Sequence, residues 1–408
     1  ATRLEFDVTD ALTVYGAVGY RDGQNDQIFP VSSRPGVDMN GVFTVGNSYY
    51  DSYSETASGT AGARWKFDTG FVGHRLNVGY SGFYQEAGNV YIPSAAGSVL
   101  SNIYNPVPLP DVGESRTDPN RASETWLNSI AIADTLSFLD ERVLLTLGVR
   151  DQTVEVKNYT GGTGYKKSRT SPLAGLVVKP WENVAVYANY AEGLTRGITV
   201  GAGYSNTGTV LAPYVSEQYE AGVKVDWGRV TTTAAVFELS RPNASGTINA
   251  VPLQAYAYDG EQRNRGVELT AFGEIVPGLR GIAGVTFLDP ELTSTTTGAD
   301  EGNDAAGVPD TTFSGGLDWD LPWVRGLSLN GRVIYTSGAY LTSANDVRFD
   351  DWTRVDIGAR YALDVGKTPV VLRANIENLF DEEYWLTTGT YATVGSPRTV
   401  LLSASVDF

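Results

Sequence analysis

The 408-residue chain contains no cysteine, one histidine and one methionine. Without cysteine, disulfides, thiolate metal sites and cysteine nucleophiles are all excluded. The single histidine, His74, rules out a histidine-rich metal centre. The formal net charge of -17 makes nucleic acid and anionic membrane surfaces poor electrostatic partners.

Long hydrophobic runs are also missing. No stretch approaches the roughly 18 apolar residues that a membrane-spanning helix needs. The first residues, ATRLEFDV, have the pattern of a strand and not of a signal peptide. Glycine (46) and tyrosine (23) are abundant instead, a mixture that favours strands, tight turns and aromatic girdles over helices.

Strict alternation of apolar and polar residues recurs along the chain. In YEAGVKVDW (219–227) the apolar side chains, Val223 among them, share one face, while Lys224 and Asp226 lie on the other. The same pattern occupies residues 143–149, 184–190, 354–362, 370–377 and 398–408, the last run ending on Phe408. Many strands exceed the ~9–11 residues that cross a bilayer at a tilt, whereas soluble strands usually have about 5–6.

The connections between these runs alternate in length. The short ones are 7–11, 68–73, 139–141, 180–183, 227–229 and 276–278, and the long ones are 23–53, 89–122, 198–213, 243–258 and 294–309. Short turns at one rim and long loops at the other are typical of outer-membrane barrels. The sequence therefore predicts an all-β fold, a transmembrane antiparallel β-barrel of the outer-membrane type with about 17 strands. A soluble β-sandwich remains the alternative.

Four stretches carry a family resemblance: VYANYAEGLTRG (186–197), SEQYEAGVKVDW (216–227), DGEQRNRGVELTAFGE (259–274) and NIENLFDEEYW (375–385). Together with the terminal aromatic, they resemble the C-terminal barrel of TonB-dependent siderophore receptors. In that family a plug domain precedes a barrel of about 22 strands. The resemblance implies that residues 1–408 are a partial barrel domain, without the plug, the energy-coupling box and about five strands.

The resemblance further implies a non-enzymatic receptor in the bacterial outer membrane. A ferric siderophore would bind to the external loops, and the TonB energy-coupling complex would drive import through the plug. No cofactor is expected, because iron arrives inside the siderophore. Outer-membrane lipid and lipopolysaccharide are the other expected partners. Two alternatives stay open: a passive pore, or a receptor for haem, cobalamin or an oligosaccharide. A surface adhesin or soluble carbohydrate-binding sandwich is a third.

Aromatic and arginine side chains in the long loops are the best ligand-binding candidates, since iron chelates are large and flat-sided. The predicted site residues are Tyr49, Tyr50, Tyr91, Arg196, Tyr204, Tyr340, Trp385 and Tyr391, and further loop tyrosines are Tyr53, Tyr104, Tyr214 and Tyr256. For Trp385 a place in the aromatic girdle is the favoured alternative.

Three other motifs have structural explanations. Arg263 and Arg265 in EQRNRG could bind an anionic ligand from a lumen face, but a charge ladder between strands is favoured. The segment GAGYSNTG (201–208) lacks the lysine and the helix of a phosphate loop. The acidic DEGND (300–304) is expected to be a solvated loop, not a calcium site.

Overall fold

The computed structural model describes residues 1–32, 37–94, 97–160, 164–201, 203–246, 250–296, 298–366, 368–387 and 392–406. Among these residues there is no helix long and apolar enough to cross a membrane. The strands are Thr2–Thr9 (β1), Leu12–Ser32 (β2), Val42–Thr69 (β3), Val72–Pro93 (β4), Val99–Asn102 (β5), Asn120–Phe138 (β6), Val143–Asn158 (β7), Tyr165–Trp181 (β8), Val184–Thr195 (β9), Tyr214–Asp226 (β10), Val230–Ser245 (β11), Ala257–Val276 (β12), Leu279–Ser294 (β13), Thr311–Asp320 (β14), Leu327–Thr336 (β15), Ala339–Tyr340 (β16), Arg348–Phe349 (β17), Trp352–Val365 (β18), Thr368–Glu377 (β19), Trp385–Thr387 (β20), Ala392–Val394 (β21) and Thr399–Val406 (β22).

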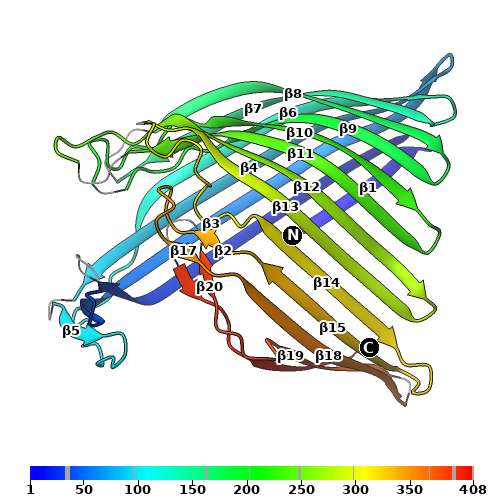
Figure 1. Ribbon diagram of the computed structural model, residues 1–408. Helices are drawn as coiled ribbons and strands as arrows, with labels where there is room; N and C mark the ends of the chain where they lie inside the picture. Colours follow the sequence, from blue (N-terminus) through cyan, green and yellow to red (C-terminus); the bar gives the residue numbers. More distant parts are fainter. Residues whose placement is uncertain are drawn as a thin grey trace.

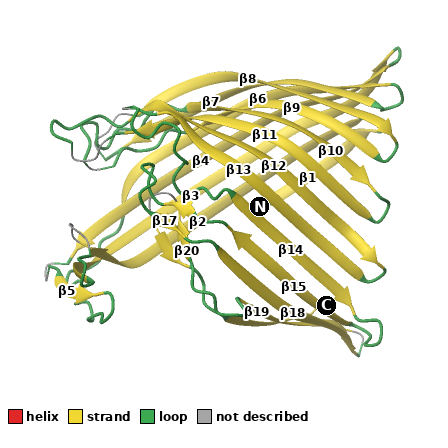
Figure 2. Cartoon of the chain, in the orientation of Figure 1, coloured by secondary structure: helices red, strands yellow, loops and turns green. Residues whose placement is uncertain are grey.

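All the long strands belong to one curved sheet (Figures 1 and 2). The sheet has 18 strands, of which β5 is a short addition that pairs with the start of β3. The hairpins β16–β17 and β20–β21 form two small separate sheets. Each long strand pairs antiparallel with the next long strand in the sequence, from β1 to β22. The predicted all-β barrel wall of about 17 strands is therefore confirmed.

The alternating residues face as the sequence predicted. Val223 of β10 pairs with Val186 of β9 and with Ala234 of β11, so these apolar side chains share one side of the sheet. At the other end of the sheet, Ala374 of β19 pairs with Leu402 of β22 on the same side. We call this side the outward face and the opposite side the lumen face.

The outward face is apolar and uncovered. Val18 of β2 is 66% exposed and Leu402 of β22 is 77% exposed. Among the described residues, no second sheet packs against these side chains. Exposed apolar area on this scale is stable only against hydrocarbon. The soluble sandwich is therefore wrong, and the outward face is the lipid-facing wall. Phe408 lies outside the described residues.

The connections separate cleanly into two rims. Tight turns such as 10–11, 182–183 and 277–278 lie at one rim, on the right in Figure 1, and we call it the turn end. The remaining connections between long strands alternate with these turns along the chain. They lie at the opposite rim, on the left, which we call the loop end. His74 lies beside the turn 70–71, at the turn end as expected.

One of the predicted long loops is largely strand, and a second begins with strand residues. The segment 23–53 was expected to be a loop, but β2 continues to Ser32 and β3 begins at Val42. Likewise β4 continues to Pro93 within the expected loop 89–122. The 28 residues of β3 span about 90 Å, far more than the ~25 Å apolar band of a barrel. Above that band neither face contacts lipid, so the alternation that reveals a strand in the sequence disappears.

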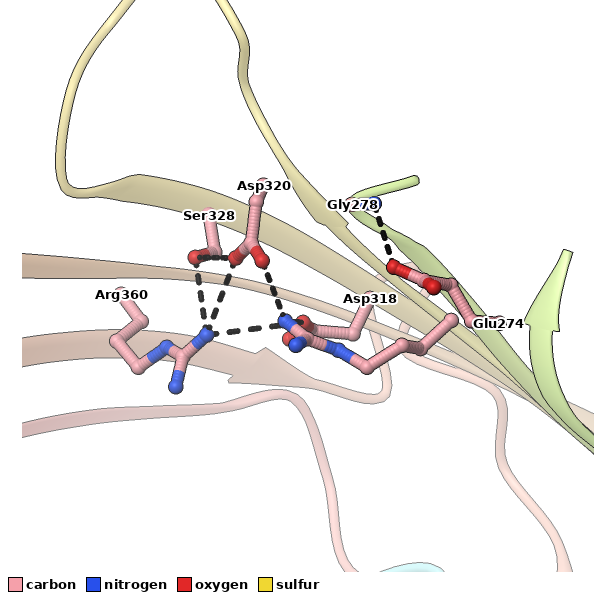
Figure 3. Close-up of polar contacts among 7 residues, drawn as sticks. Glu274, Gly278, Asp318, Asp320, Ser328 and Arg360 are labelled. Atoms are coloured by element: carbon pink, nitrogen blue, oxygen red, sulfur yellow. Dashed lines mark hydrogen bonds and ion pairs between the residues drawn. The ribbon is translucent and has the colours of Figure 1, made fainter. Parts of the chain in front are cut away.

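Charged side chains cross-link neighbouring strands on the lumen face near the turn end (Figure 3). Arg280 of β13 binds Asp318 at 2.6 Å and Asp320 at 2.8 Å, both on β14. Arg360 of β18 reaches Asp320 at 3.4 Å, and the Ser328 hydroxyl of β15 donates to the same carboxylate at 2.6 Å. This ladder ties four consecutive strands together on the face that does not contact lipid.

The sheet has two edge strands. Among the described residues β1 pairs only with β2, and β22 pairs only with β19. Both edge strands run from the loop end toward the turn end, so they could not pair with each other in an antiparallel manner.

The two faces of β10 give a stability prediction. Val223→Arg, near the middle of the apolar band, should lower the free energy of unfolding by about 2–4 kcal/mol, because it places a charge in hydrocarbon. Lys224→Gln on the lumen face should cost less than about 1 kcal/mol, mainly through its lost contact with the Tyr187 ring. Urea unfolding of the protein in lipid vesicles measures both free energies. Equal tolerance of the two changes would show that the faces are misassigned.

Candidate functional site

The described candidate residues gather into three groups, all at the loop end. The first involves the connection between β9 and β10, which folds against the lumen face of the wall. Val210 in this connection packs on Val154 and Val156 of β7, which are 0% and 1% exposed. Asn158 of β7 donates its side-chain N–H to the Gly208 carbonyl at 2.8 Å. The connection is therefore held in one position by a small apolar core.

Tyrosines from three strands and two loops gather around this connection. The Tyr165 hydroxyl accepts the Gly197 N–H at 3.2 Å, and the Tyr258 hydroxyl accepts the Ile198 N–H at 3.2 Å. The rings of Tyr214 and Tyr258 lie 4.9 Å apart, as do those of Tyr204 and Tyr256. With Arg196, these side chains form what we call the tyrosine–arginine cluster: Tyr165, Arg196, Tyr204, Tyr214, Tyr256 and Tyr258.

A second loop completes the cluster. Asn206 donates to the Tyr256 carbonyl at 2.9 Å and accepts the Tyr256 N–H at 2.9 Å, so it acts as a backbone-like bridge between the two loops. The Tyr204 hydroxyl donates to the Gly246 carbonyl at 3.3 Å. Both loops are thus fixed relative to each other, with two tyrosine rings between them.

Electrostatics in this cluster favour neutral hydroxyl groups. Burial, followed by the nearby Tyr204 and Tyr258 hydroxyls, raises the pKa of Tyr256, so its hydroxyl stays protonated and can donate. The Nε atom of Arg196 is buried, with no hydrogen-bond partner among the described residues. The predicted residues Arg196 and Tyr204 are therefore brought together, whereas Tyr165 and Tyr258 were missed.

The second group lies on the extended strands β3 and β4. Tyr50 and Tyr91 are direct cross-strand partners, and the Phe29 ring lies 6.4 Å from Tyr50. The Arg116 guanidinium stacks over the Tyr49 ring at 4.2 Å and forms an ion pair with the buried Asp51. Tyr49, Tyr50 and Tyr91, predicted in loops, are thus strand residues.

Tyr53 was also expected in a loop and is a strand residue too. It lies further along β3, where its hydroxyl donates to Glu86 at 2.7 Å. Tyr104 does lie in a loop, and it is 81% exposed.

The third group lies in the loops after β15 and β19. The Arg348 guanidinium stacks over the Tyr340 ring at 5.7 Å within the hairpin β16–β17. Phe349 of this hairpin stacks on Trp385 of the hairpin β20–β21, with ring centroids 5.8 Å apart. Trp385 therefore belongs to a loop-end hairpin outside the main sheet and not to one of the long wall strands. Tyr391 lies outside the described residues.

The NLFDEEYW motif builds the base of this third group. Asp356 of β18 accepts the Asn378 N–H at 2.9 Å and binds Arg354 at 2.9 Å. Tyr384 stacks on Trp352 at 4.3 Å, and a Cβ on Gly395 would come within 2.3 Å of the Tyr384 ring. Glycine is therefore required there, and the motif anchors the loop to the wall.

The EQRNRG motif has a structural role. Arg265 pairs with Glu238 and Glu291, and Arg263 pairs with Glu291, so the favoured charge ladder between strands is confirmed. These arginines alternate in phase with Val267, on the outward face. The alternative of a lumen-facing arginine is wrong.

Metal and nucleophile chemistry has little support at either rim. Within the described ranges, no three His, Cys, Asp or Glu side chains are arranged to hold a metal ion. His74 bonds to Asp134 at 2.7 Å and to the Thr69 hydroxyl at 2.6 Å, at the turn end, far from the three aromatic groups. The loop end therefore offers ring faces, hydroxyls and a few arginines as contact groups for a ligand.

Comparisons with known proteins agree with this chemistry. Residues 1–379 match the family model described as "TonB dependent receptor-like, beta-barrel". The ferrichrome receptor FcuA of Yersinia enterocolitica is 36% identical over all of this chain and 55% of its own length. The probable siderophore receptor PiuA of Acinetobacter baumannii is 28% identical over all of this chain and 60% of its own length. The chain thus spans somewhat more than half the length of these relatives.

Solved structures share the fold. The ferric preacinetobactin receptor BauA of Acinetobacter baumannii superposes with a TM-score of 0.85 at 33% identity, over all of this chain and 62% of that one. The apolar outward face, the two unlike rims and the match over residues 1–379 together lead to one conclusion. The chain belongs to the TonB-dependent receptor family and forms an outer-membrane β-barrel wall.

Proposed function

We propose that this chain forms the barrel of an outer-membrane receptor that binds a ferric siderophore at its loop end and takes part in its import. The observation that carries the proposal is the tyrosine–arginine cluster, a fixed set of ring faces and protonated hydroxyls on two cross-linked loops. Such a surface binds large, flat-sided chelates by stacking and hydrogen bonding, and its rigidity lowers the entropy cost of binding.

The names of the relatives support the same ligand class. They include receptors for ferrichrome in Yersinia enterocolitica and for ferrioxamine B in Salmonella typhimurium. A siderophore supplies all the donor atoms for its iron, so the protein needs no metal ligands of its own. The absence of cysteine and the single histidine in the sequence are consistent with that division.

Import would require two further partners, a plug domain and the TonB energy-coupling complex. Support for them comes from the family, whose members depend on TonB, and not from any contact within this chain.

Lipid and lipopolysaccharide would surround the wall. The charged residues Arg263, Arg265 and Glu291, on the outward face above Val267, lie where the polar part of the outer leaflet would meet the barrel. We propose no enzymatic activity, because the curated relatives are receptors and transporters.

A passive pore is the second candidate. The lumen-face charges that support it, such as Arg280, Asp318 and Arg360, would also suit a water-filled channel.

Planar-bilayer conductance distinguishes the two functions. The complete natural receptor should show no large open current without energy coupling, since a gated receptor keeps its lumen closed. A porin of known conductance serves as the positive control. A steady current of porin size from the receptor would replace the gated-receptor proposal with the pore.

Removing a cluster ring should weaken ligand binding. Tyr256→Ala deletes a ring that stacks against Tyr204 and a hydroxyl held protonated, so siderophore affinity should fall about tenfold, or roughly 1.4 kcal/mol. Fluorescence quenching of the purified receptor by the ferric siderophore gives the dissociation constant. Tyr361→Ala, on the outward face of β18, is the matched control and should leave it unchanged. An unaltered constant for Tyr256→Ala would move the site elsewhere.

Removing the Asn206 bridge between the loops 196–213 and 246–256 should weaken siderophore binding by making both loops less rigid. Asn206→Ala removes two hydrogen bonds, each worth about 1 kcal/mol, and leaves both tyrosine rings present. Hydrogen exchange in 203–213 and 250–256 should become faster, and affinity should fall several-fold because the loops must be ordered on binding. Ser205→Ala, an exposed neighbour, is the control. Unchanged exchange in these segments would contradict the bridging role of Asn206.

A further inference from the structure

The acidic excess of the chain is concentrated at the loop end. The connections there, 33–41, 94–119, 159–164, 196–213, 246–256, 295–310, 337–351 and 378–398, carry fourteen acidic and five basic residues. The connections at the turn end carry four of each. The loop-end connections therefore carry a net charge of minus nine, while those at the turn end are balanced.

The few cations of these loop-end connections are mostly engaged. Arg116 forms an ion pair with the buried Asp51, and Arg398 pairs with Asp381 at 3.5 Å. Arg348 stacks over the Tyr340 ring at 5.7 Å. Arg34 lies outside the described residues. Arg196, in the tyrosine–arginine cluster, is the remaining basic residue of the loop-end connections.

The aromatic surface itself is almost uncharged. The two loops that build it, 196–213 and 246–256, contain no acidic residue and only Arg196 as a base. Along the rim the surface lies between the uncharged connection 159–164 and the loop 295–310, which carries four carboxylates. In that loop, burial and then the neighbouring carboxylates of Asp310 and Asp289 raise the pKa of Asp304.

Ferric siderophores differ sharply in charge. Three hydroxamates, each a monoanion, neutralise the ferric ion, so a trihydroxamate complex is neutral, or cationic if it carries a free amine. Three catecholates, each a dianion, leave the complex with three negative charges. An acidic entrance repels an approaching anion and attracts a cation, and juxtaposed like charges also weaken the final complex.

We propose that this receptor selects ferric chelates by charge, accepting neutral or cationic hydroxamate-type complexes on the tyrosine–arginine cluster and rejecting tris-catecholate complexes at the acidic loop end. The inference rests on the proposed siderophore function and adds the chemical class of the ligand. Ring stacking and tyrosine hydroxyls bind the neutral complex, and the acidic loops supply the discrimination.

Binding to the full receptor, measured by fluorescence quenching, tests the selection with three probes: ferrichrome, ferrioxamine B and a ferric tris-catecholate. Ionic strength is varied from about 0.01 M to about 1 M, which shortens the screening length from about 30 Å to about 3 Å. The two hydroxamates should bind at least about tenfold more tightly than the catecholate at low salt. Added salt should strengthen catecholate binding, weaken ferrioxamine B binding and leave ferrichrome nearly unchanged.

A charge-neutralised receptor isolates the loops as the cause. Asp350→Asn, Glu382→Gln and Glu383→Gln remove three exposed carboxylates at the loop end without changing side-chain size. Catecholate affinity should rise several-fold in this triple variant, with little change for ferrichrome. A matched control removes the same charge at the turn end through Asp10→Asn, Asp140→Asn and Glu182→Gln. It should change neither the catecholate affinity nor the ferrichrome affinity.

Failure of the charge selection can be distinguished from failure of the proposed siderophore function. Catecholate binding as tight as hydroxamate binding at low salt, or unaffected by salt, overturns the charge selection while leaving a siderophore receptor. No binding of any of the three complexes overturns the siderophore function itself, and the inference with it. The salt series on the unmodified receptor decides the matter even if the triple variant fails to fold.

Discussion

Hydrocarbon offers no hydrogen bonds, so every backbone N–H and C=O of a membrane-spanning sheet must pair with a neighbouring strand. Between its two edge strands, the unbroken antiparallel ladder from β1 to β22 meets that constraint, and the lipid around it requires the alternation seen in the sequence. Residues on one side must be apolar because they contact lipid, as Val223 and Leu402 do. Residues on the other side are free to carry charges such as Arg280 and Asp318, which then cross-link the strands that the ladder already joins. The lipid-facing pattern and the lumen ladder are thus two results of one requirement.

The wall continues above the lipid, and there the apolar residues change sides. In β7 the outward apolar residues end at Val149, and the next apolar residues, Val154 and Val156, lie on the lumen face and are buried by Val210. Leu292 of β13 is likewise buried, beyond the outward Phe287. A shift by one residue in the phase of the pattern therefore marks the level at which the wall leaves the membrane and begins to support inward-folded loops. Those loops are held by packing, which gives the aromatic groups fixed positions.

Much of the fold could be predicted from the sequence because lipid contact on one face requires an apolar residue at every second position, as in residues 219–227 and 370–377. The tight turns could be placed for the same reason. The extended parts of β2, β3 and β4 could not, since no lipid contact imposes an apolar face there: the buried Asp51 follows the partly exposed Tyr50 in the chain. Within the site, Arg196 and Tyr204 could be recognised as loop residues. Their neighbours Tyr165 and Tyr258 could not, because they begin strands and join the cluster through contacts across more than thirty positions in the chain. The phase shift at Val154 was the one local signal of the inward-folded loop.

In a barrel wall of this kind, the interactions that stabilise the structure are separate from those that would select the ligand. The strong interactions lie in the ladder and in ion pairs such as Arg354–Asp356, which hold the loops in place and do not depend on the ligand. The surface left for the ligand has uncharged tyrosines, whose stacking and hydroxyl groups bind many flat-sided complexes with similar affinity. Such a surface discriminates poorly by itself. Charge at the rim can supply the missing discrimination without rebuilding the surface, because a long-range field acts before contact is made. The placement of acidic residues in the loops 295–310, 337–351 and 378–398, and not in the two that build the tyrosine–arginine cluster, is the arrangement that this division of roles requires.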